Sequence, residues 1–280
     1  MAEDHRLELE DNRRLWDAWT AIHTRGAFYD VQRFRDDEDD IRISALERKE
    51  VGEIAGRSLL HLQCHFGLDT LSWARLGAAR VTGLDFSEPA IAFARELATE
   101  VGLTDRARFV VSNVYDALTV LEGETFDVVY TSRGVLGWLP DIERWADVVV
   151  ACIAPGGTFF INEAHPALWT VAEAQQTPND LHLDFDYWGG ATYSFPVQGS
   201  YADPDADVDA EVEHGWNHSL GEIVTALASR GLRIEYLREK PRIYWPVEWL
   251  VEREPGAWGF PAEQEGSLPL TFSLRAHKEA

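Results

Sequence analysis

Cysteine is scarce in this chain, which has two in 280 residues, Cys64 and Cys152. Secreted domains that depend on disulfides are far richer in cysteine, so the composition excludes a disulfide framework. We expect both thiols to be reduced and to act as small buried hydrophobic groups. Long apolar runs are also lacking, because no stretch approaches the roughly 20 residues that span a bilayer. Residues 1–14 are charged throughout and lack the apolar segment of a signal peptide. We therefore expect a cytoplasmic protein with no membrane partner.

Basic residues are also few compared with acidic ones. Lysine and arginine number 25 against 48 acidic residues, which gives a formal net charge of −23. Proteins that bind nucleic acids gain most of their non-specific affinity by neutralising phosphates with basic side chains. The longest basic run here is Arg13-Arg14, so we expect no nucleic-acid partner. The hydrophobic content of 45% is ample for the core of one large domain.

What the chain does contain is an alternation of short apolar strands and helices. Residues 58–64 predict a buried strand, a tight loop follows at Gly67, residues 69–76 predict a helix, and residues 80–85 predict a second strand ending at Asp85. In such a unit the loop backbone offers N–H groups to an anionic group. A carboxylate about 20 residues further on can bind the hydroxyls of a ribose. Asp85 follows Gly67 by 18 residues, so the spacing predicts a site for a nucleoside-containing cofactor.

Three further strands continue the alternation. They are predicted over residues 108–113, 126–132 and 158–163, with helices over 88–97 and 141–154. Ser87 and Pro89 start the first of these helices well, and Pro155-Gly156-Gly157 ends the second. Strands that alternate with helices form a parallel sheet covered on both faces.

The series resembles the class I S-adenosylmethionine-dependent methyltransferases, in register from Leu59 to Glu163 and more loosely over residues 220–240 and 270–277. The resemblance implies an α/β, Rossmann-like fold with a mostly parallel seven-stranded sheet and S-adenosyl-L-methionine as the cofactor. It also implies a set of cofactor-binding residues, in which Asp85 would bind the ribose, Phe86 and Asn113 the adenine, and the strand-four hydroxyls the methionine part. That set is Gln63, His65, Gly67, Asp85, Phe86, Asn113, Thr131 and Ser132.

The first motif departs from the family pattern. An acidic residue followed by Gly-x-Gly-x-Gly is usual there, whereas this chain reads His-Leu-Gln-Cys-His-Phe-Gly from His61 to Gly67. Gln63 and His65 can present backbone groups to a cofactor if their dihedral angles are ordinary. The alternative is a regulatory protein that has lost the cofactor. A nicotinamide-dependent oxidoreductase would need a Gly-x-Gly-x-x-Gly loop, which is absent.

The remaining segments are predicted to surround this half. Residues 1–57 would form a helical cap, 58–164 the cofactor-binding half, and 165–216 an inserted antiparallel β flap. Residues 217–280 would complete a single domain, with a substrate loop over 241–269. Eight of the 11 tryptophans follow strand four, largely in the flap and this loop. Aromatic walls near the acids Asp184 and Asp186 favour an aromatic or amine-containing small-molecule substrate.

Methyl transfer requires the nucleophile to be placed in line with the methyl group, and a base only if that nucleophile starts protonated. Glu163, at the end of strand five, is our candidate base, and His165 is the second. We expect Asp69 to cap the helix after Gly67. The histidines lack the spacing of a metal site, so we expect no metal. The leading hypothesis is O-, N- or C-methylation of a metabolite; the sequence does not fix the oligomeric state.

Overall fold

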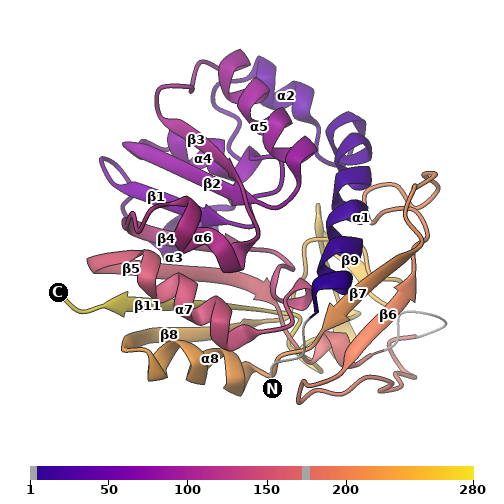
Figure 1. Ribbon diagram of the computed structural model, residues 1–280. Coiled ribbons are helices and arrows are strands. Elements are labelled where there is room, and N and C mark those ends of the chain that lie inside the picture. The colour runs from indigo at the N-terminus through magenta and orange to yellow at the C-terminus, as the bar shows by residue number, and fades with distance from the viewer. Residues whose placement is uncertain (1–4, 172–176) are drawn as a thin grey trace.

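A computed structural model describes residues 5–171 and 177–280 (Figure 1). Residues 1–4 of the expected cap and 172–176 of the expected flap lie outside this described part. The α-helices are α1 (Arg6–Arg25), α2 (Val31–Asp36), α3 (Ala45–Val51), α4 (Leu68–Arg75), α5 (Glu88–Glu100), α6 (Ala117–Val120), α7 (Ile142–Cys152) and α8 (Leu220–Ser229). The strands are β1 (Ser58–Leu62), β2 (Arg80–Asp85), β3 (Ala107–Val111), β4 (Phe126–Ser132), β5 (Ile153–Ala164), β6 (Thr192–Pro196), β7 (Val212–Trp216), β8 (Leu232–Lys240), β9 (Val251–Glu254), β10 (Ala257–Gly259) and β11 (Thr271–Lys278).

Seven strands form one central sheet in the order β3-β2-β1-β4-β5-β11-β8. β1 pairs in parallel with both β2 and β4, and β11 runs antiparallel to both of its neighbours. The expected mostly parallel α/β fold is confirmed. The carboxyl ends of β1, β2, β4 and β5 therefore meet along one edge, where open α/β sheets bind their ligands.

The central strands are apolar on both faces, which is why they lie inside the sheet rather than at its edge. One face packs against α7 and α8 through side chains such as Trp145 and Leu227. The other packs against α4 and α5, with Trp73 and Ile91 among the contacts. Cys64 and Cys152 are both free and buried, as expected.

Several elements differ in their bounds from the predicted ones, and three of the differences lie near the site. β1 ends at Leu62 rather than at residue 64, so Gln63 already belongs to the loop. β5 begins at Ile153 and includes the Pro155-Gly156-Gly157 turn within its length. The expected substrate loop is not entirely irregular, because β9 and β10 form a small hairpin inside it.

The predicted flap contains an antiparallel pair, β6 with β7, and α1 lies beside it (Figure 1). Asn12 of α1 binds the outer edge of β7 with two hydrogen bonds, donating to His214 O and accepting from His214 N, both at 2.8 Å. The helix thereby satisfies backbone groups that an edge strand leaves open. Among the described residues, every helix is too short or too polar to cross a lipid bilayer.

Candidate cofactor and substrate site

The loop between β1 and α4 takes left-handed backbone at three positions. Gln63 has φ 57°, His65 has φ 52° and Gly67 has φ 87°. The dihedral angles at Gln63 and His65 are therefore not ordinary, so the condition set for these two residues is not met. Positive φ is usual for glycine and costs roughly 1–3 kcal/mol for other residues. The loop keeps the backbone turns that glycine normally supplies, with two larger side chains in place of glycine.

Two structural features require glycine at position 67, at the start of α4. Its φ favours glycine, and an added Cβ would lie 2.8 Å from Phe109 Cε1 and 2.9 Å from Ala94 Cβ. No side chain fits between the loop, α5 and β3 at this point. The N-cap of α4 is Gly67, and the side chain of Asp69 makes no capping bond, so the expected cap by Asp69 is wrong.

Asp85 closes the other side of the loop. Its Oδ2 accepts from His65 N at 2.7 Å, and its Oδ1 accepts from Ser87 N at 3.0 Å. An ionised carboxylate has about four acceptor positions, so two remain. The side chain is 7% exposed, and burial raises the pKa of Asp85 to about 6, against the opposing effect of these two N–H donors.

The other predicted cofactor residues fall along the same edge of the sheet. Asn113 Oδ1 accepts from Tyr115 N at 3.0 Å and so caps a short 3₁₀ turn. Thr131 is fully buried and donates to Leu62 O at 3.2 Å, which ties β4 to β1. Phe86 is half-buried and Ser132 is buried. The structure thus brings the predicted set together at the ends of β1, β2 and β4 and just beyond β3.

Glu163 holds the loop that follows β4. Its Oε1 accepts from Gly134 N at 2.6 Å and Ala164 N at 2.7 Å. Its Oε2 accepts from Val135 N at 2.8 Å and Leu136 N at 3.2 Å. Burial raises the pKa of Glu163 to about 7, whereas the four N–H donors all favour the ionised form. With four bonds its acceptor positions are filled, so this geometry supports a structural role rather than that of a base.

His165, the second candidate base, is also engaged. Its Nδ1 accepts from Ala167 N at 3.1 Å, and its Nε2 lies 2.9 Å from Glu239 Oε1. The ring is buried, and burial lowers the pKa of His165 while the neighbouring Glu239 opposes this effect. For either nitrogen of His165 to accept a proton from a substrate, the ring would first have to give up one of these contacts.

Sequence reasoning missed a buried ionic network under the same loop. Arg133 has φ 64° and donates to Glu47 Oε2 at 3.0 Å. Tyr130 donates to the other oxygen of Glu47, also at 3.0 Å. The carboxylate of Asp69 also lies 3.9 Å from the guanidinium of Arg133. A capping-box pattern at Ser44 and Glu47 was visible in the sequence, but the partner 86 residues away was not.

The contacts of α1 with the cofactor loop were also missed. The rings of Trp16 and His65 lie 5.1 Å apart, and His23 Nδ1 lies 3.2 Å from His65 Nε2. His23 Nε2 in turn lies 2.6 Å from Ser200 Oγ of the flap, and Trp19 donates to Gly199 O at 2.9 Å. The loop is therefore covered by a helix from the start of the chain and by residues from its second half.

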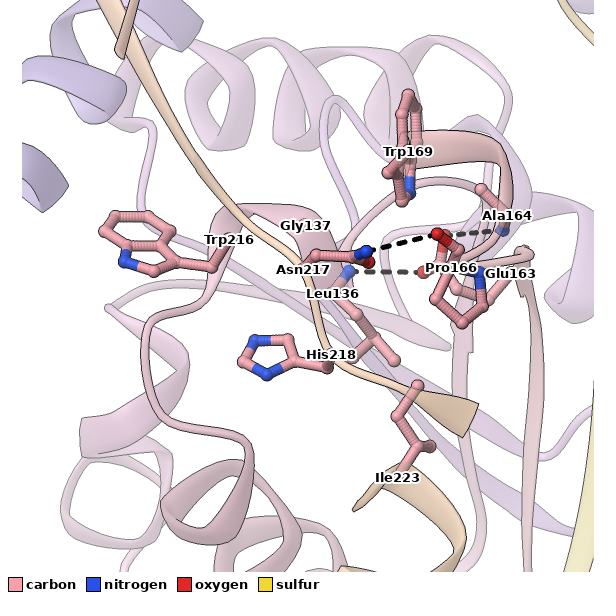
Figure 2. Close-up of a pocket in the computed structure, with 10 residues that line it drawn as sticks. All are labelled: Leu136, Gly137, Glu163, Ala164, Pro166, Trp169, Trp216, Asn217, His218 and Ile223. Atoms are coloured by element: carbon pink, nitrogen blue, oxygen red, sulfur yellow. Dashed lines mark hydrogen bonds between the residues drawn. The ribbon is translucent and has the colours of Figure 1, made fainter. Parts of the chain in front are cut away.

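A small cavity of about 10 Å³ lies beyond the ends of β4 and β5 (Figure 2). Its wall includes Gly137 after β4, Glu163 of β5, Trp169, and Asn217 and His218 before α8. His218 is directed away from the amide of Asn217 in this view, and its Nε2 lies 2.6 Å from Leu139 O. Asp184 and Asp186, expected near a cationic group, are exposed loop residues.

Comparison with known proteins agrees with this geometry. Residues 60–161 match the family model described as "Methyltransferase domain". The ribosomal RNA large subunit methyltransferase K/L of Pseudomonas paraeruginosa is 26% identical over 174 residues, covering 59% of this chain. This chain spans only 22% of that relative's length.

Solved structures share the fold over most of the chain. An S-adenosylmethionine-dependent methyltransferase of Mesorhizobium loti has a TM-score of 0.59 at 23% identity, covering 82% of this chain and 95% of the other. The geranyl diphosphate C-methyltransferase of Streptomyces coelicolor A3(2), solved with S-adenosyl-L-homocysteine, has a TM-score of 0.52 at 13% identity, covering 82% of this chain and 76% of the other. Residues 60–161 match a methyltransferase domain, and the chain has the fold of class I S-adenosylmethionine-dependent methyltransferases.

Proposed function

We propose that the protein transfers a methyl group from S-adenosylmethionine to a small-molecule metabolite. The observation that carries the cofactor site is the bond from His65 N to Asp85, which joins the left-handed loop to the carboxylate at the end of β2. Asp85 would bind the ribose, with Phe86 and Asn113 beside the adenine. Gln63, Gly67, Thr131 and Ser132 would line the methionine side. Bound S-adenosylmethionine supplies a methyl group made electrophilic by its sulfonium.

Unpaired acceptors around Asp85 fit such a cofactor. Gln63 Oε1 and Asp17 Oδ1 are buried without a hydrogen-bond partner among the described residues. The negative charge of Asp17 is close enough to raise the pKa of Asp85. Buried acceptors without donors are costly and call for a ligand or water. The ribose hydroxyls and the α-ammonium of S-adenosylmethionine are donors of the required kind.

Two observations support a small-molecule substrate: the net charge of the protein and the segments that cover the cofactor loop. A net charge of −23 repels a polyphosphate chain. The loop is covered by α1 and by Ser200 of the flap, which suits a ligand enclosed by protein. The relatives named for ribosomal RNA match over a small part of their length, so nucleic-acid methylation is the second candidate.

Calorimetry tests the cofactor site. The purified protein is titrated with S-adenosylmethionine, with S-adenosylhomocysteine, and with NAD as the control. We expect micromolar binding of the first two, no binding of NAD, and a strong loss of affinity in Asp85→Ala. A folded protein that binds neither methionine-derived ligand would show that the altered first motif has removed the site.

Product analysis tests the substrate class. Protein and S-adenosylmethionine labelled in the methyl group are incubated separately with a low-molecular-weight cell extract and with total RNA. We expect label in the small-molecule fraction. Label in RNA alone would overturn the proposed substrate and leave the cofactor assignment standing.

A further inference from the structure

The side-chain amide of Asn217 has a fixed orientation. Its Nδ2 donates to Pro166 O at 3.2 Å and to Asp186 O at 3.0 Å. Rotating the amide by half a turn would place Oδ1 against these two carbonyl oxygens, which are acceptors only. The unengaged end of the amide is therefore Oδ1. Asn217 is 3% exposed, and Oδ1 has no hydrogen-bond partner in the described part of the chain.

A buried carbonyl without a donor is costly, about 1–3 kcal/mol, so native structures rarely keep one without a ligand or water to pair it. Asn217 lines the cavity of about 10 Å³ shown in Figure 2. A space of this size holds one water molecule or a group of similar size. It therefore fits the polar head of a ligand, such as an amino group, and not its whole body.

The position of the cavity is that of a substrate site. Its walls come from the loop after β4, at Leu136 and Gly137, and from the end of β5, at Glu163. Ligands bind at this edge of a parallel sheet. Trp169 lines the cavity too, and its ring stacks on Trp245 with centroids 6.4 Å apart and an interplanar angle of 15°. This pair presents a flat aromatic wall to the body of a ligand.

The acid–base groups around the cavity are already occupied. Glu163 accepts four backbone N–H bonds, and both nitrogens of His165 have contacts. His218 Nε2 lies 2.6 Å from Leu139 O, and burial lowers the pKa of His218. These groups are therefore not free to act as a base for a nucleophile that must lose a proton before attack. An uncharged amine needs none, because its lone pair is already available.

We propose that Asn217 Oδ1 accepts a hydrogen bond from the methyl-accepting nitrogen of an uncharged aromatic amine, whose ring lies against Trp169. The inference rests on the proposed methyltransferase function. One N–H is held by Asn217, and the nitrogen lone pair forms the new bond to the methyl carbon. The carbon–sulfur bond breaks with its electron pair remaining on sulfur, and the methylated ammonium product releases its proton to water. Asn217 is a substrate-positioning residue and takes no proton.

Three probes of one shape test the proposal: aniline, phenol and toluene. Each is titrated into the protein saturated with S-adenosylhomocysteine, with dissociation constants from ligand-observed NMR at pH 7.5. One hydrogen bond to a buried unpaired acceptor corresponds to about tenfold in affinity. We expect the wild-type protein to bind aniline about tenfold more tightly than toluene. In Asn217→Leu we expect the two affinities to become about equal.

The outcomes separate the two proposals. Failure of S-adenosylhomocysteine to bind would count against the proposed function itself. If that ligand binds, equal affinities for aniline and toluene in the wild-type protein, or binding of neither, would overturn the role of Asn217 and leave a water as the partner of Oδ1. Methylation of phenol but not of aniline, with S-adenosylmethionine in place of S-adenosylhomocysteine, would overturn the amine assignment. The wild-type comparison needs no variant, so it stands even if Asn217→Leu folds poorly without its two amide bonds.

Discussion

The backbone N–H of His65 donates to Asp85 Oδ2 at 2.7 Å, across the mouth of the loop between β1 and α4. Asp85 therefore sets the position of the loop as well as offering oxygens to a ribose. The second oxygen, bound to Ser87 N, does the same for the start of α5. Loop, carboxylate and helix form one hydrogen-bonded unit, and the cofactor predictions depend on it.

Affinity for S-adenosylhomocysteine should depend on pH through Asp85. Burial raises the pKa of Asp85 to about 6, so the carboxylate is ionised above this pH and protonated below it. The ionised form accepts two ribose hydroxyls, whereas the protonated form loses acceptor capacity. We expect constant affinity above about pH 7 and weaker binding below pH 6. Calorimetry from pH 5 to 8 measures it, and Asp85→Asn should bind weakly with a flat profile. The same slope in the variant would assign it to another group.

Gly67→Ala should destabilise the protein through both φ and contact. The new Cβ would come within 2.9 Å of Phe109 and Ala94, in addition to the strained φ of 87°. We expect a loss of about 2–4 kcal/mol in the free energy of unfolding in urea. The matched control is Gly156→Ala, where φ is 76° and nothing lies within 4 Å of the new Cβ. Equal losses in the two variants would show that packing at Gly67 contributes nothing.

Glu163→Gln should loosen the loop after β4. Glutamine keeps one acceptor oxygen but turns an NH₂ group toward two backbone N–H donors. Two unpaired buried donors cost about 2–4 kcal/mol together, and the melting temperature should fall. Binding of S-adenosylhomocysteine should weaken at the same time, because Val135 O of this loop accepts a hydrogen bond from Gln63, a proposed cofactor residue. A variant with unchanged melting and cofactor binding that nevertheless fails to methylate would restore Glu163 as a base.

His23 should make the fold sensitive to mild acid. Burial lowers the pKa of His23 to about 4, below its ordinary value near 6.5. The unfolded chain then binds more protons than the folded chain between these values, so stability is complete above pH 6.5 and is lost as pH falls toward 4. We expect a loss on the order of 2–3 kcal/mol from this residue. Urea unfolding at pH 7 and pH 4.5 measures it.

The controls are His23→Gln and the exposed His182→Gln. The first should lose less stability than the wild-type protein between the two pH values, and the second should behave as the wild-type protein does. If all three proteins lose the same amount, groups other than His23, such as the buried His61, carry the acid sensitivity.

The strand pattern could be predicted from sequence because the central strands are mostly apolar, and β2 and β4 end at the polar residues Asp85 and Ser132. β2 and β4 begin and end as predicted, and the β6–β7 pair was expected from two strand-like runs in the predicted flap. A local signal also gave Ser87 as a helix cap. Asp85 was found because its distance from Gly67 along the chain is a property of the βα unit.

Side-chain partners far apart in sequence could not be predicted. Nothing near Glu163 in the sequence shows that four backbone donors from two segments fill its acceptor positions. His65 and His23 are 42 residues apart, and their contact exists only because α1 lies over the loop. The sequence around Asn217 does not indicate a role in binding. That role depends on which end of its side-chain amide has hydrogen-bond partners, and only the structure shows this.

The non-glycine residues of the first loop have a consequence for how the loop meets its ligand. A loop of glycines samples many conformations and must lose that freedom on binding. Here Gln63 donates to Val135 O at 3.1 Å, and the ring of His65 rests against His23 and Trp16. The free-energy cost of left-handed backbone at Gln63 and His65 is incurred when the chain folds and not when the cofactor binds. The loop then loses less conformational entropy when the cofactor binds. Gln63 and His65 therefore preorganise the loop, although they also make it differ from the glycine-rich motif.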